Sequence, residues 1–282
     1  MRFRGDRRQG SARGAGIDSS ETKPAGVAVW IVLPAYNEAA ALPPLLEAIE
    51  GLGRRLAGTA AVRVVVVDDG SSDGTGEVAR SFAGRIPLTV LVHPKNRGLA
   101  AAIRTGLEHA CRAADADGVI VTMDADNTHS PDQIPAMLDV LRDGADVVIA
   151  SRYQRGASQA GVPPHRALLS TGVGWLLRLR FALPGVRDYS CGYRAYRADL
   201  LGQALTAYGP RLIESAGFVV MTELLVKLAA FRPRIVEVAL DLRYDRKAGR
   251  SKMPAVRTIL GYLRLIASRY PRVPGPPPEE TR

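Results

Sequence analysis

Short, β-branched, almost uninterrupted apolar runs alternate with helical patterns along the first half of this chain, and this alternation restricts its fold most strongly. The runs lie at 27–33, 62–67, 88–92, 119–123 and 146–150. The helical patterns between them lie at about 38–50, 73–82, 99–114 and 131–141. Strands that are apolar on both faces are typical of parallel sheets covered by helices. The pattern predicts an α/β fold with a doubly wound, mostly parallel sheet that binds ligands at the carboxyl ends of its strands.

After Arg152 the regular alternation stops. Helical patterns and irregular segments follow at about 166–179, 188–197, 218–231 and 254–270, with a further strand at 235–242. We interpret these elements as a C-terminal cover of helices and loops on the same sheet. Residues 1–26 are rich in Arg, Gly and Ser and predict a disordered basic arm, and residues 271–282 predict a Pro-rich tail. One folded domain is therefore expected at 27–270.

The charge balance favours a polyanionic partner. The chain has 38 Lys and Arg against 28 Asp and Glu, a formal charge of +10. Nucleotides, phospholipids and nucleic acid all suit such an excess. Because RNP-type aromatics, zinc-ligand spacing and a basic recognition helix are missing from the sequence, we expect no nucleic-acid partner, and a nucleic-acid-binding protein is kept only as a remote alternative.

The cysteines and the apolar segments bear on location. Cys111 and Cys191 cannot form a disulfide framework, and no secretory signal is recognisable, so we expect free thiols and a cytoplasmic protein. No stretch approaches the roughly 18 uninterrupted apolar residues of a spanning helix. Any membrane contact is therefore expected to be peripheral, on the cytoplasmic face.

Two carboxylates, Asp124 and Asp126, directly follow the apolar run at 119–123. Separated by one small residue at a strand end, both can face one hard cation that a bound diphosphate also coordinates. For the tripeptide alone, a helix cap or a solvated loop explains the acids equally well. Polar residues at two further strand ends favour the metal-bridged pyrophosphate site.

Those two strand ends are 33–38 and 67–75. Asp69 can accept hydrogen bonds from a base or ribose, and Tyr36 can pack on a base. Asp73 is equally well explained as a helix cap, and Asp68 as a structural acid, so neither is assigned to the site.

Neither a Walker A sequence nor a G-x-G-x-x-G follows any expected strand. The pyrophosphate charge must then be neutralised by a metal and by basic side chains, for which Arg152, Arg246 and Lys252 are candidates. The run at 245–252 suits a mobile lid, although most runs of this kind are solvated loops.

Together these motifs resemble the family 2 glycosyltransferases of the GT-A fold, and among them the dolichol- and polyprenyl-phosphate mannosyltransferase (dolichol-phosphate mannose synthase) branch. The segments that carry the resemblance are LPAYNEAAALP at 33–43, VVVVDDGSSDGT at 64–75, NRGLAAAIRTGLEHA at 96–110, MDADNTHSP at 123–131, ASRY at 150–153, GF at 217–218 with Glu223, and DRKAGRSK at 245–252.

The resemblance implies a role for individual residues. A nucleotide-sugar donor would be bound by Pro34, Tyr36, Glu38, Val67 and Asp69; Mg²⁺ or Mn²⁺ would be held by Asp124 and Asp126, with a backbone contact from Ala125; and the donor and acceptor phosphates would meet Arg152, Arg246 and Lys252. This sequence departs from the family pattern at two places. Thr128 stands where several relatives carry a metal-binding Gln, so a third protein ligand to the metal is not assigned. Residues 188–194 read DYSCGYR in place of a D-L-T-G-S-F-R-like segment, which leaves the sugar and the acceptor open.

The implied reaction is an inverting, metal-dependent transfer of a hexose, with mannose from GDP-mannose as the first candidate, to a polyprenyl or dolichyl phosphate. A phosphate monoester is largely dianionic at neutral pH and needs little general-base help. The alternative is a sugar or small-molecule hydroxyl acceptor, which requires a carboxylate base such as Glu214, Asp188 or Glu223.

A lipid acceptor would require contact with a membrane surface, either directly or through a membrane-protein partner. Apolar stripes with basic neighbours at 254–270 and 168–179 suit such contact, and packing against the sheet explains them equally well.

Overall fold

The computed structural model describes residues 26–161, 164–246 and 255–268, with side chains at 26–161, 171–246 and 258–268. The arm expected at 1–26, except Gly26, and the tail expected at 271–282 lie outside these residues. None of the described helices is long and apolar enough to cross a membrane.

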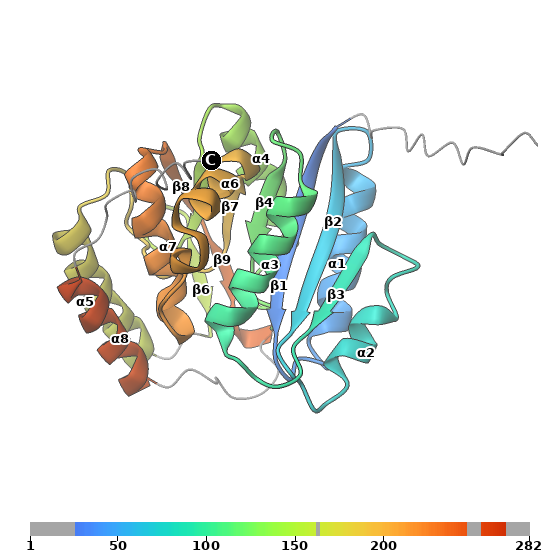
Figure 1. Cartoon of the computed structure of the whole chain (residues 1–282), viewed down its shortest axis with the longest axis horizontal. Helices are drawn as coiled ribbons and strands as arrows, with labels where there is room; N and C mark the ends of the chain where they lie inside the picture. The colour runs from blue at the N-terminus through green and yellow to red at the C-terminus, as the bar shows by residue number, and fades with distance from the viewer. Residues whose placement is uncertain (1–25, 162–163, 247–254, 269–282) are drawn as a thin grey trace, which may run out of the picture.

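A seven-stranded sheet forms the centre of the molecule (Figure 1), in the order β3-β2-β1-β4-β7-β5-β8. Its strands are β1 (Val27–Ala35), β2 (Ala60–Asp68), β3 (Leu88–Val92), β4 (Val119–Thr122), β5 (Val147–Ser151), β7 (Arg194–Arg197) and β8 (Ile235–Ala239). All neighbours pair in parallel except β7, which runs antiparallel to both β4 and β5. The predicted mostly parallel sheet is therefore confirmed, as are its first five strands.

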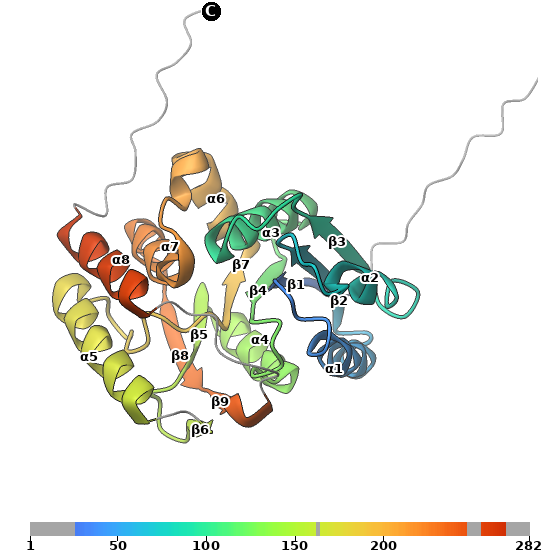
Figure 2. The same cartoon turned by 90° about the horizontal axis from the view of Figure 1, so that it is seen from below.

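Helices cover both faces of this sheet. Seen from the edge where the parallel strands end (Figure 2), α3 (Leu99–Ala113), α6 (Ala198–Tyr208) and α7 (Val220–Leu228) lie on one face, and α1 (Leu42–Arg55) and α4 (Ile134–Arg142) lie on the other. Helix α3 approaches the sheet closely at Gly106, where a Cβ atom would lie 2.4 Å from Cγ1 of Val32. Only glycine fits this contact without a shift, and the contact fixes the helix over β1.

The remaining elements are shorter or lie at the periphery. They are α2 (Thr75–Arg80), η1 (Pro131–Gln133), β6 (Ser158–Ala160), α5 (Pro164–Phe181), η2 (Gly209–Leu212), η3 (Gly217–Val219), η4 (Ala229–Phe231), β9 (Asp241–Arg243), η5 (Tyr244–Arg246) and α8 (Ala255–Ala267). Strands β6 and β9 form a separate parallel pair. Helices α5 and α8 lie side by side beyond β8, at the opposite end of the molecule from β3 (Figures 1 and 2).

The structure corrects several predicted elements. The helix expected at 38–50 begins only at Leu42, because the preceding residues bind the loop after β2. The stretch expected to be irregular at 188–197 ends in β7, and α6 follows it. The strand expected at 235–242 is two strands, β8 and β9, which belong to different sheets.

Candidate active site

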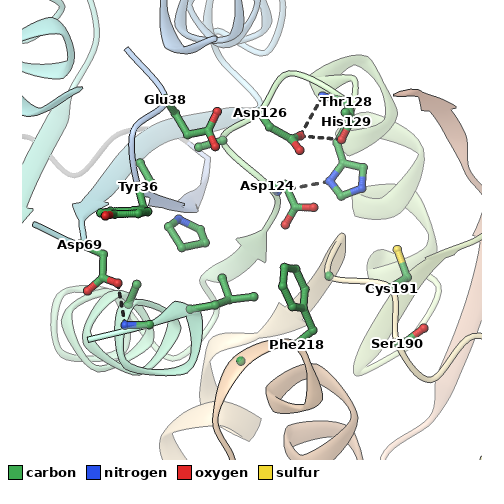
Figure 3. A pocket seen from close by; sticks show the side chains of 18 of the residues that line it. Tyr36, Glu38, Asp69, Asp124, Asp126, Thr128, His129, Ser190, Cys191 and Phe218 are labelled. Carbon is green, nitrogen blue, oxygen red and sulfur yellow. Dashed lines mark hydrogen bonds between the residues drawn. The ribbon is translucent and has the colours of Figure 1, made fainter. Parts of the chain in front are cut away.

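A pocket of about 560 Å³ opens at the carboxyl ends of β1, β2, β4 and β5. Eight of the residues predicted for the site line it: Pro34, Tyr36, Glu38, Asp69, Asp124, Ala125, Asp126 and Arg152. Figure 3 shows Tyr36 and Asp69 at one side, Asp124 and Asp126 in the middle, and Ser190, Cys191 and Phe218 on the other side. The sheet therefore brings these eight predicted residues, which span 118 positions from Pro34 to Arg152, into one cavity.

Asp124 and Asp126 lie on the turn that follows β4. Asp126 Oδ1 accepts hydrogen bonds from the Thr128 hydroxyl at 2.6 Å and from the Thr128 backbone N–H at 3.2 Å. The backbone of Asn127 takes a φ of 63°, which tightens this turn. Thr128, where a metal-binding Gln was expected from the resemblance, thus holds one of the two acids in place.

The same turn is fixed from its other side by His129. The backbone N–H of Asp124 donates to His129 Nδ1 at 3.2 Å, and the imidazole stacks on Tyr193 with 5.0 Å between ring centroids. The Tyr193 hydroxyl donates to the Ser130 carbonyl at 2.8 Å. His129 therefore supports the backbone beneath Asp124.

These two carboxylates fit a hard divalent cation. Oxygen ligands suit Mg²⁺ and Mn²⁺, and such ions commonly take one or two protein carboxylates and complete their shell with substrate phosphates and water. Within the described residues no cluster of three or more His, Cys, Asp or Glu side chains could hold a metal ion. A cation at Asp124 and Asp126 would accordingly need further ligands from a bound diphosphate or from water.

The edge of the pocket near Tyr36 is formed by two interlocked loops, one after β1 and one after β2. Backbone N–H groups of Asn37 and Glu38 donate to the hydroxyls of Ser71 (3.0 Å) and Thr75 (2.9 Å). The side chain of Asn37, whose φ is 52°, accepts from the backbone N–H of Ser72 at 2.9 Å. These bonds hold the loop that carries Tyr36 and Glu38 and delay the start of α1.

Asp73 also belongs to this interlock and, as sequence reasoning expected, is not among the residues that line the pocket. Its carboxylate accepts from the Ala39 N–H at 3.0 Å, from the Thr75 N–H at 3.0 Å and from the Thr75 hydroxyl at 2.5 Å. Burial acts to raise the pKa of Asp73, but these hydrogen bonds outweigh it, and the pKa lies below its usual value. Asp68, interpreted as structural, accepts from the Ser71 N–H at 2.9 Å.

Asp69 is almost completely buried, and its carboxylate is already engaged. Oδ1 lies 2.6 Å from His93 Nδ1 and accepts from the Arg97 N–H at 2.9 Å, while Oδ2 accepts from the Gly98 N–H at 2.7 Å. His93 Nε2 lies 3.0 Å from the Thr105 hydroxyl. An ionised carboxylate offers about four acceptor positions, so about one remains for a base or ribose. Asp69 thus organises the loop between β3 and α3 as well as facing the pocket.

Two predicted site residues are not among those that line the pocket. The side chain of Val67 is fully buried in the sheet and packs against α3 near Gly106. Arg246 lies in η5 and is exposed, outside the residues that line the pocket. Lys252 lies outside the described residues, so the lid expected at 245–252 is described only as far as Arg246.

Arg152 enters the pocket from the end of β5 and is held by Asp188. Its Nε and one terminal nitrogen donate to the two Asp188 oxygens at 2.8 and 2.7 Å, and the same terminal nitrogen donates to the Ser190 hydroxyl at 2.7 Å. Burial disfavours both charges, but the mutual attraction outweighs it: the pKa of Arg152 is raised and that of Asp188 is lowered. The pair is therefore ionised at neutral pH.

The three carboxylates nominated as general bases all lie outside the set of pocket-lining residues. Asp188 is committed to Arg152. Glu223 is buried, accepts from the backbone N–H groups of Glu214 and Ser215 at 3.0 and 2.8 Å, and pairs with Lys227 at 2.6 Å. Lys227 also donates to Glu214 at 2.9 Å. This ionic cluster supports the loop before Gly217 and Phe218.

Neither cysteine suits nucleophilic chemistry. Both are free thiols, as expected, and Cys191 lines the pocket. Burial raises the pKa of the Cys191 thiol to about 12, and the nearby Asp188 carboxylate adds to the effect. A thiol with so high a pKa remains protonated and is a poor nucleophile.

Several pocket residues were missed by sequence reasoning as site residues: Asn96, Gly98, Ser190, Gly192, Gly217, Phe218, Leu240, Leu242 and Tyr244. Asn96 and Gly98 stand within the quoted NRG segment, and Gly217 and Phe218 are the quoted GF pair. Local patterns therefore carried a signal for these four, whereas nothing in the spacing linked Ser190 to Arg152.

Comparison with known proteins supplies the family. The family model described as Glycosyl transferase family 2 matches residues 30–205. An undecaprenyl-phosphate mannosyltransferase from Micrococcus luteus is 36% identical over 230 residues, which cover 80% of this chain and 87% of that protein. A polyprenol monophosphomannose synthase from Mycolicibacterium smegmatis is 32% identical over 256 residues, which cover 90% of this chain and 89% of that protein.

A longer relative and a solved structure agree with this match. A dolichol-phosphate mannosyltransferase from Pyrococcus furiosus is 32% identical over 84% of this chain, which spans 62% of that protein. Glucosyl-3-phosphoglycerate synthase from Mycobacterium tuberculosis, solved with Mn²⁺ and UDP-glucose, has a TM-score of 0.59 and 23% identity over 85% of this chain and 79% of its own. This likeness confirms the expected GT-A fold. The chain belongs to glycosyl transferase family 2.

Proposed function

We propose that this glycosyltransferase moves a hexose, with mannose from GDP-mannose as the first candidate, onto a polyprenyl phosphate with inversion at the anomeric carbon. The observation that carries the proposal is the order of groups across one pocket. An aromatic and an acid for the nucleoside (Tyr36, Asp69) lie at one side, the acid pair for a metal diphosphate (Asp124, Asp126) lies in the middle, and a guanidinium (Arg152) completes the set. The relative from Micrococcus luteus that is named an undecaprenyl-phosphate mannosyltransferase supports the same reaction.

A Mg²⁺ or Mn²⁺ ion held by Asp124 and Asp126 would supply charge stabilisation to the leaving nucleoside diphosphate. Residues of this chain position the acid pair and the nucleoside-binding loop. Thr128 and His129 keep the two acids in place before substrate arrives, so little reorganisation is needed during the reaction. Tyr36 offers a flat apolar surface for a base, and the 33–38 loop that carries it is fixed by its interlock with the loop after β2.

The acceptor is proposed to be a phosphate because the pocket lacks the bases that were nominated for a hydroxyl acceptor. Asp188 is neutralised by Arg152, and Glu223 by Lys227. A phosphate monoester is largely dianionic near pH 7 and attacks without losing a proton to the protein. Positioning the two substrates then accounts for most of the rate enhancement.

A surface on α5 and α8 suits a lipid acceptor. Five large apolar side chains are 43–70% exposed on these two helices, and we call them the α5–α8 apolar surface: Trp175, Leu176, Leu179, Leu260 and Leu263. Arg180 of α5 and Arg264 of α8 are exposed near them. Apolar side chains flanked by cations are typical of helices that lie on anionic membranes, and we propose that this surface contacts the bilayer.

The α5–α8 apolar surface is joined to the pocket through α8. Gly261 of α8 packs so closely on Val219 that a Cβ atom would lie 2.7 Å from Val219 Cγ2. Val219 ends η3, whose Gly217 and Phe218 line the pocket. A polyprenyl phosphate held at this surface would therefore have its headgroup near the Phe218 side of the pocket.

The test is a panel of GDP-, UDP- and dTDP-sugars offered with undecaprenyl phosphate and either Mg²⁺ or Mn²⁺. We expect release of GDP from GDP-mannose and formation of an acid-labile, lipid-linked mannose. Label found only in a water-soluble glycoside would replace the lipid phosphate by a hydroxyl acceptor. Preference for a sugar on another nucleotide would change the proposed donor and leave the proposed acceptor unchanged.

A further inference from the structure

We propose that Asp188 is a positioning residue for the transfer: it fixes the Arg152 guanidinium as an oriented, charge-neutralised hydrogen-bond donor on the acceptor side of the pocket. This inference rests on the proposed function, because it concerns the phosphate that attacks the sugar. Asp188 does not line the pocket and acts only through Arg152 and the loop that follows it.

Asp188 holds both Arg152 and the loop at 190–191, and we call this set of hydrogen bonds the Asp188 clamp. Besides the two guanidinium bonds, Oδ2 accepts from the backbone N–H of Arg152 at 3.1 Å. Oδ1 also accepts from the N–H groups of Ser190 and Cys191 at 3.3 and 3.0 Å. One fully buried carboxylate thus ties together three pocket-lining residues that come from two separate segments. Such a paired, planar fork leaves Arg152 little rotational freedom.

Asp188 is itself held by the sheet. Glu237 of β8 is buried, and its Oε1 accepts from the backbone N–H groups of Arg187 and Asp188, both at 2.6 Å. The next carbonyl, that of Tyr189, accepts from the Arg194 guanidinium at 2.6 Å and from the Thr222 hydroxyl at 2.9 Å. These bonds from the core fix the position of Asp188, and Asp188 in turn fixes the position of the Arg152 guanidinium.

The place of Arg152 in the sheet identifies the substrate group that it meets. Strand β5 lies three positions from β1 in the order β1-β4-β7-β5, which corresponds to about 14 Å at the usual strand spacing. The nucleoside side of the pocket is formed by the ends of β1 and β2, and the acid pair follows β4, which lies between β1 and β5 in the sheet. Arg152 lies beyond the acid pair, on the side where a transferred sugar and its acceptor must meet.

The charge balance of the clamp predicts an unusual kinetic signature. With Asp188 ionised, the pair has no net charge, so Arg152 offers directed N–H groups without strong attraction for anions. Asp188→Asn removes the countercharge and leaves Arg152 with its full positive charge but a looser orientation. We expect a dianionic acceptor to bind at least as tightly and to react more slowly.

The experiment measures kcat and the acceptor KM with GDP-mannose and undecaprenyl phosphate in detergent micelles. For Asp188→Asn we expect kcat to fall about tenfold or more with an unchanged or lower acceptor KM. Asp139→Asn makes the same charge change in an exposed pair with Arg142 on α4 and should match the wild type. A kcat within about twofold of the wild type, or a rise in acceptor KM, would overturn the proposal.

Arg152→Lys covers the case in which Asp188→Asn does not fold, because lysine keeps the charge and loses the fork. We expect a similar loss of kcat, and near-normal turnover would refute the clamp. The Arg152 Nε–H signal in ¹⁵N NMR gives a readout that needs no substrate: it should be protected from exchange in the wild type and lose protection in Asp188→Asn. If the wild type shows a protected Arg152 signal but does not use this substrate pair, the proposed function is rejected and the clamp is retained. If the Arg152 signal of the wild type is not protected, the clamp is rejected.

Discussion

The carboxylate of Asp73, in the loop after β2, accepts a hydrogen bond from the backbone N–H of Ala39, in the loop after β1, at 3.0 Å. Together with the bonds from Asn37 and Glu38 to Ser71 and Thr75, it joins the ends of two neighbouring parallel strands. The polypeptide that presents Tyr36 to the pocket is therefore held by a partner more than thirty residues away in sequence.

Replacing Asp73 by Ala should destabilise the protein by about 1 kcal/mol, the usual cost of losing a side chain that caps backbone N–H groups. Because the folded-state pKa of Asp73 is lowered, its contribution is complete above the unfolded pKa of about 3.9 and is lost as the pH falls through the lower folded value. Urea unfolding of the wild type and of the Asp73→Ala variant between pH 7 and pH 3 measures the difference in stability at each pH. The control is Asp117→Ala, which removes an exposed acid before β4. A stability difference between the wild type and Asp73→Ala that does not change with pH would contradict the prediction.

Replacing Asp124 or Asp126 by Asn should abolish metal-dependent turnover without unfolding the protein. Each change removes a charged oxygen ligand from the proposed cation site. Calorimetry with Mn²⁺ and GDP gives a readout besides activity: we expect the wild type to bind Mn²⁺ more tightly with GDP present, and both variants to lose this coupling. Asp132→Asn, near the same turn and exposed, should keep it. Full turnover by both acid-pair variants would remove these residues from the site.

Replacing His93 by Ala should weaken nucleoside diphosphate binding about tenfold. The change leaves one oxygen of the buried Asp69 carboxylate without its closest partner, at a cost of about 1–3 kcal/mol. His93→Asn can restore a donor toward Asp69 and should recover most of the affinity. Fluorescence titration with GDP measures both variants. Equal affinity of the Ala variant and the wild type would show that Asp69 is positioned without His93.

Replacing Leu179, the most exposed side chain of the α5–α8 apolar surface at 70%, by Ser should reduce binding to anionic vesicles. Losing one buried leucine side chain costs about 1.5–3 kcal/mol of transfer free energy. Val92→Ser removes an exposed apolar side chain at the far end of the sheet, on β3, and is the matched control. Vesicle flotation measures both, and binding that is equal for the two variants would place the membrane contact elsewhere.

The parallel part of the fold could be predicted because burial on both faces leaves a direct mark in the sequence. Strand β1 is buried from Val29 to Ala35, and apolar side chains occupy all of these positions. Strand β7 gave no such mark. It reads RAYR, and its first residue, Arg194, is fully buried because backbone carbonyls of Tyr189 and Met221 accept its hydrogen bonds. Helix α6 did carry an amphipathic signal, at Leu200, Leu201, Ala204 and Tyr208, which sequence reasoning overlooked.

The candidate site likewise has a part that could be predicted from the sequence and a part that could not. Tyr36, Asp69, Asp124 and Asp126 follow strands directly, so the rule that parallel strands end at one edge was enough to group them. The pairing of Arg152 with Asp188 joins positions 36 residues apart across an antiparallel neighbour, and no local spacing encodes it. Sequence reasoning consequently treated Arg152 as a candidate for neutralising the substrate phosphates, and named Asp188 only as one of three candidate bases for the alternative hydroxyl acceptor.

Within the described seven-stranded sheet, β7 is the one reversed strand, and its direction has a consequence for the pocket. Because β7 runs against its neighbours, the loop that precedes it opens at the same edge as the loops that follow β4 and β5. Under the proposed function, residues 190–192 would therefore face the acceptor, whereas the nucleoside would be bound by the separate segment at 34–69. On this proposal, acceptor specificity and donor specificity depend on separate segments of the chain, so substitutions in one segment are expected to leave the contacts of the other unchanged.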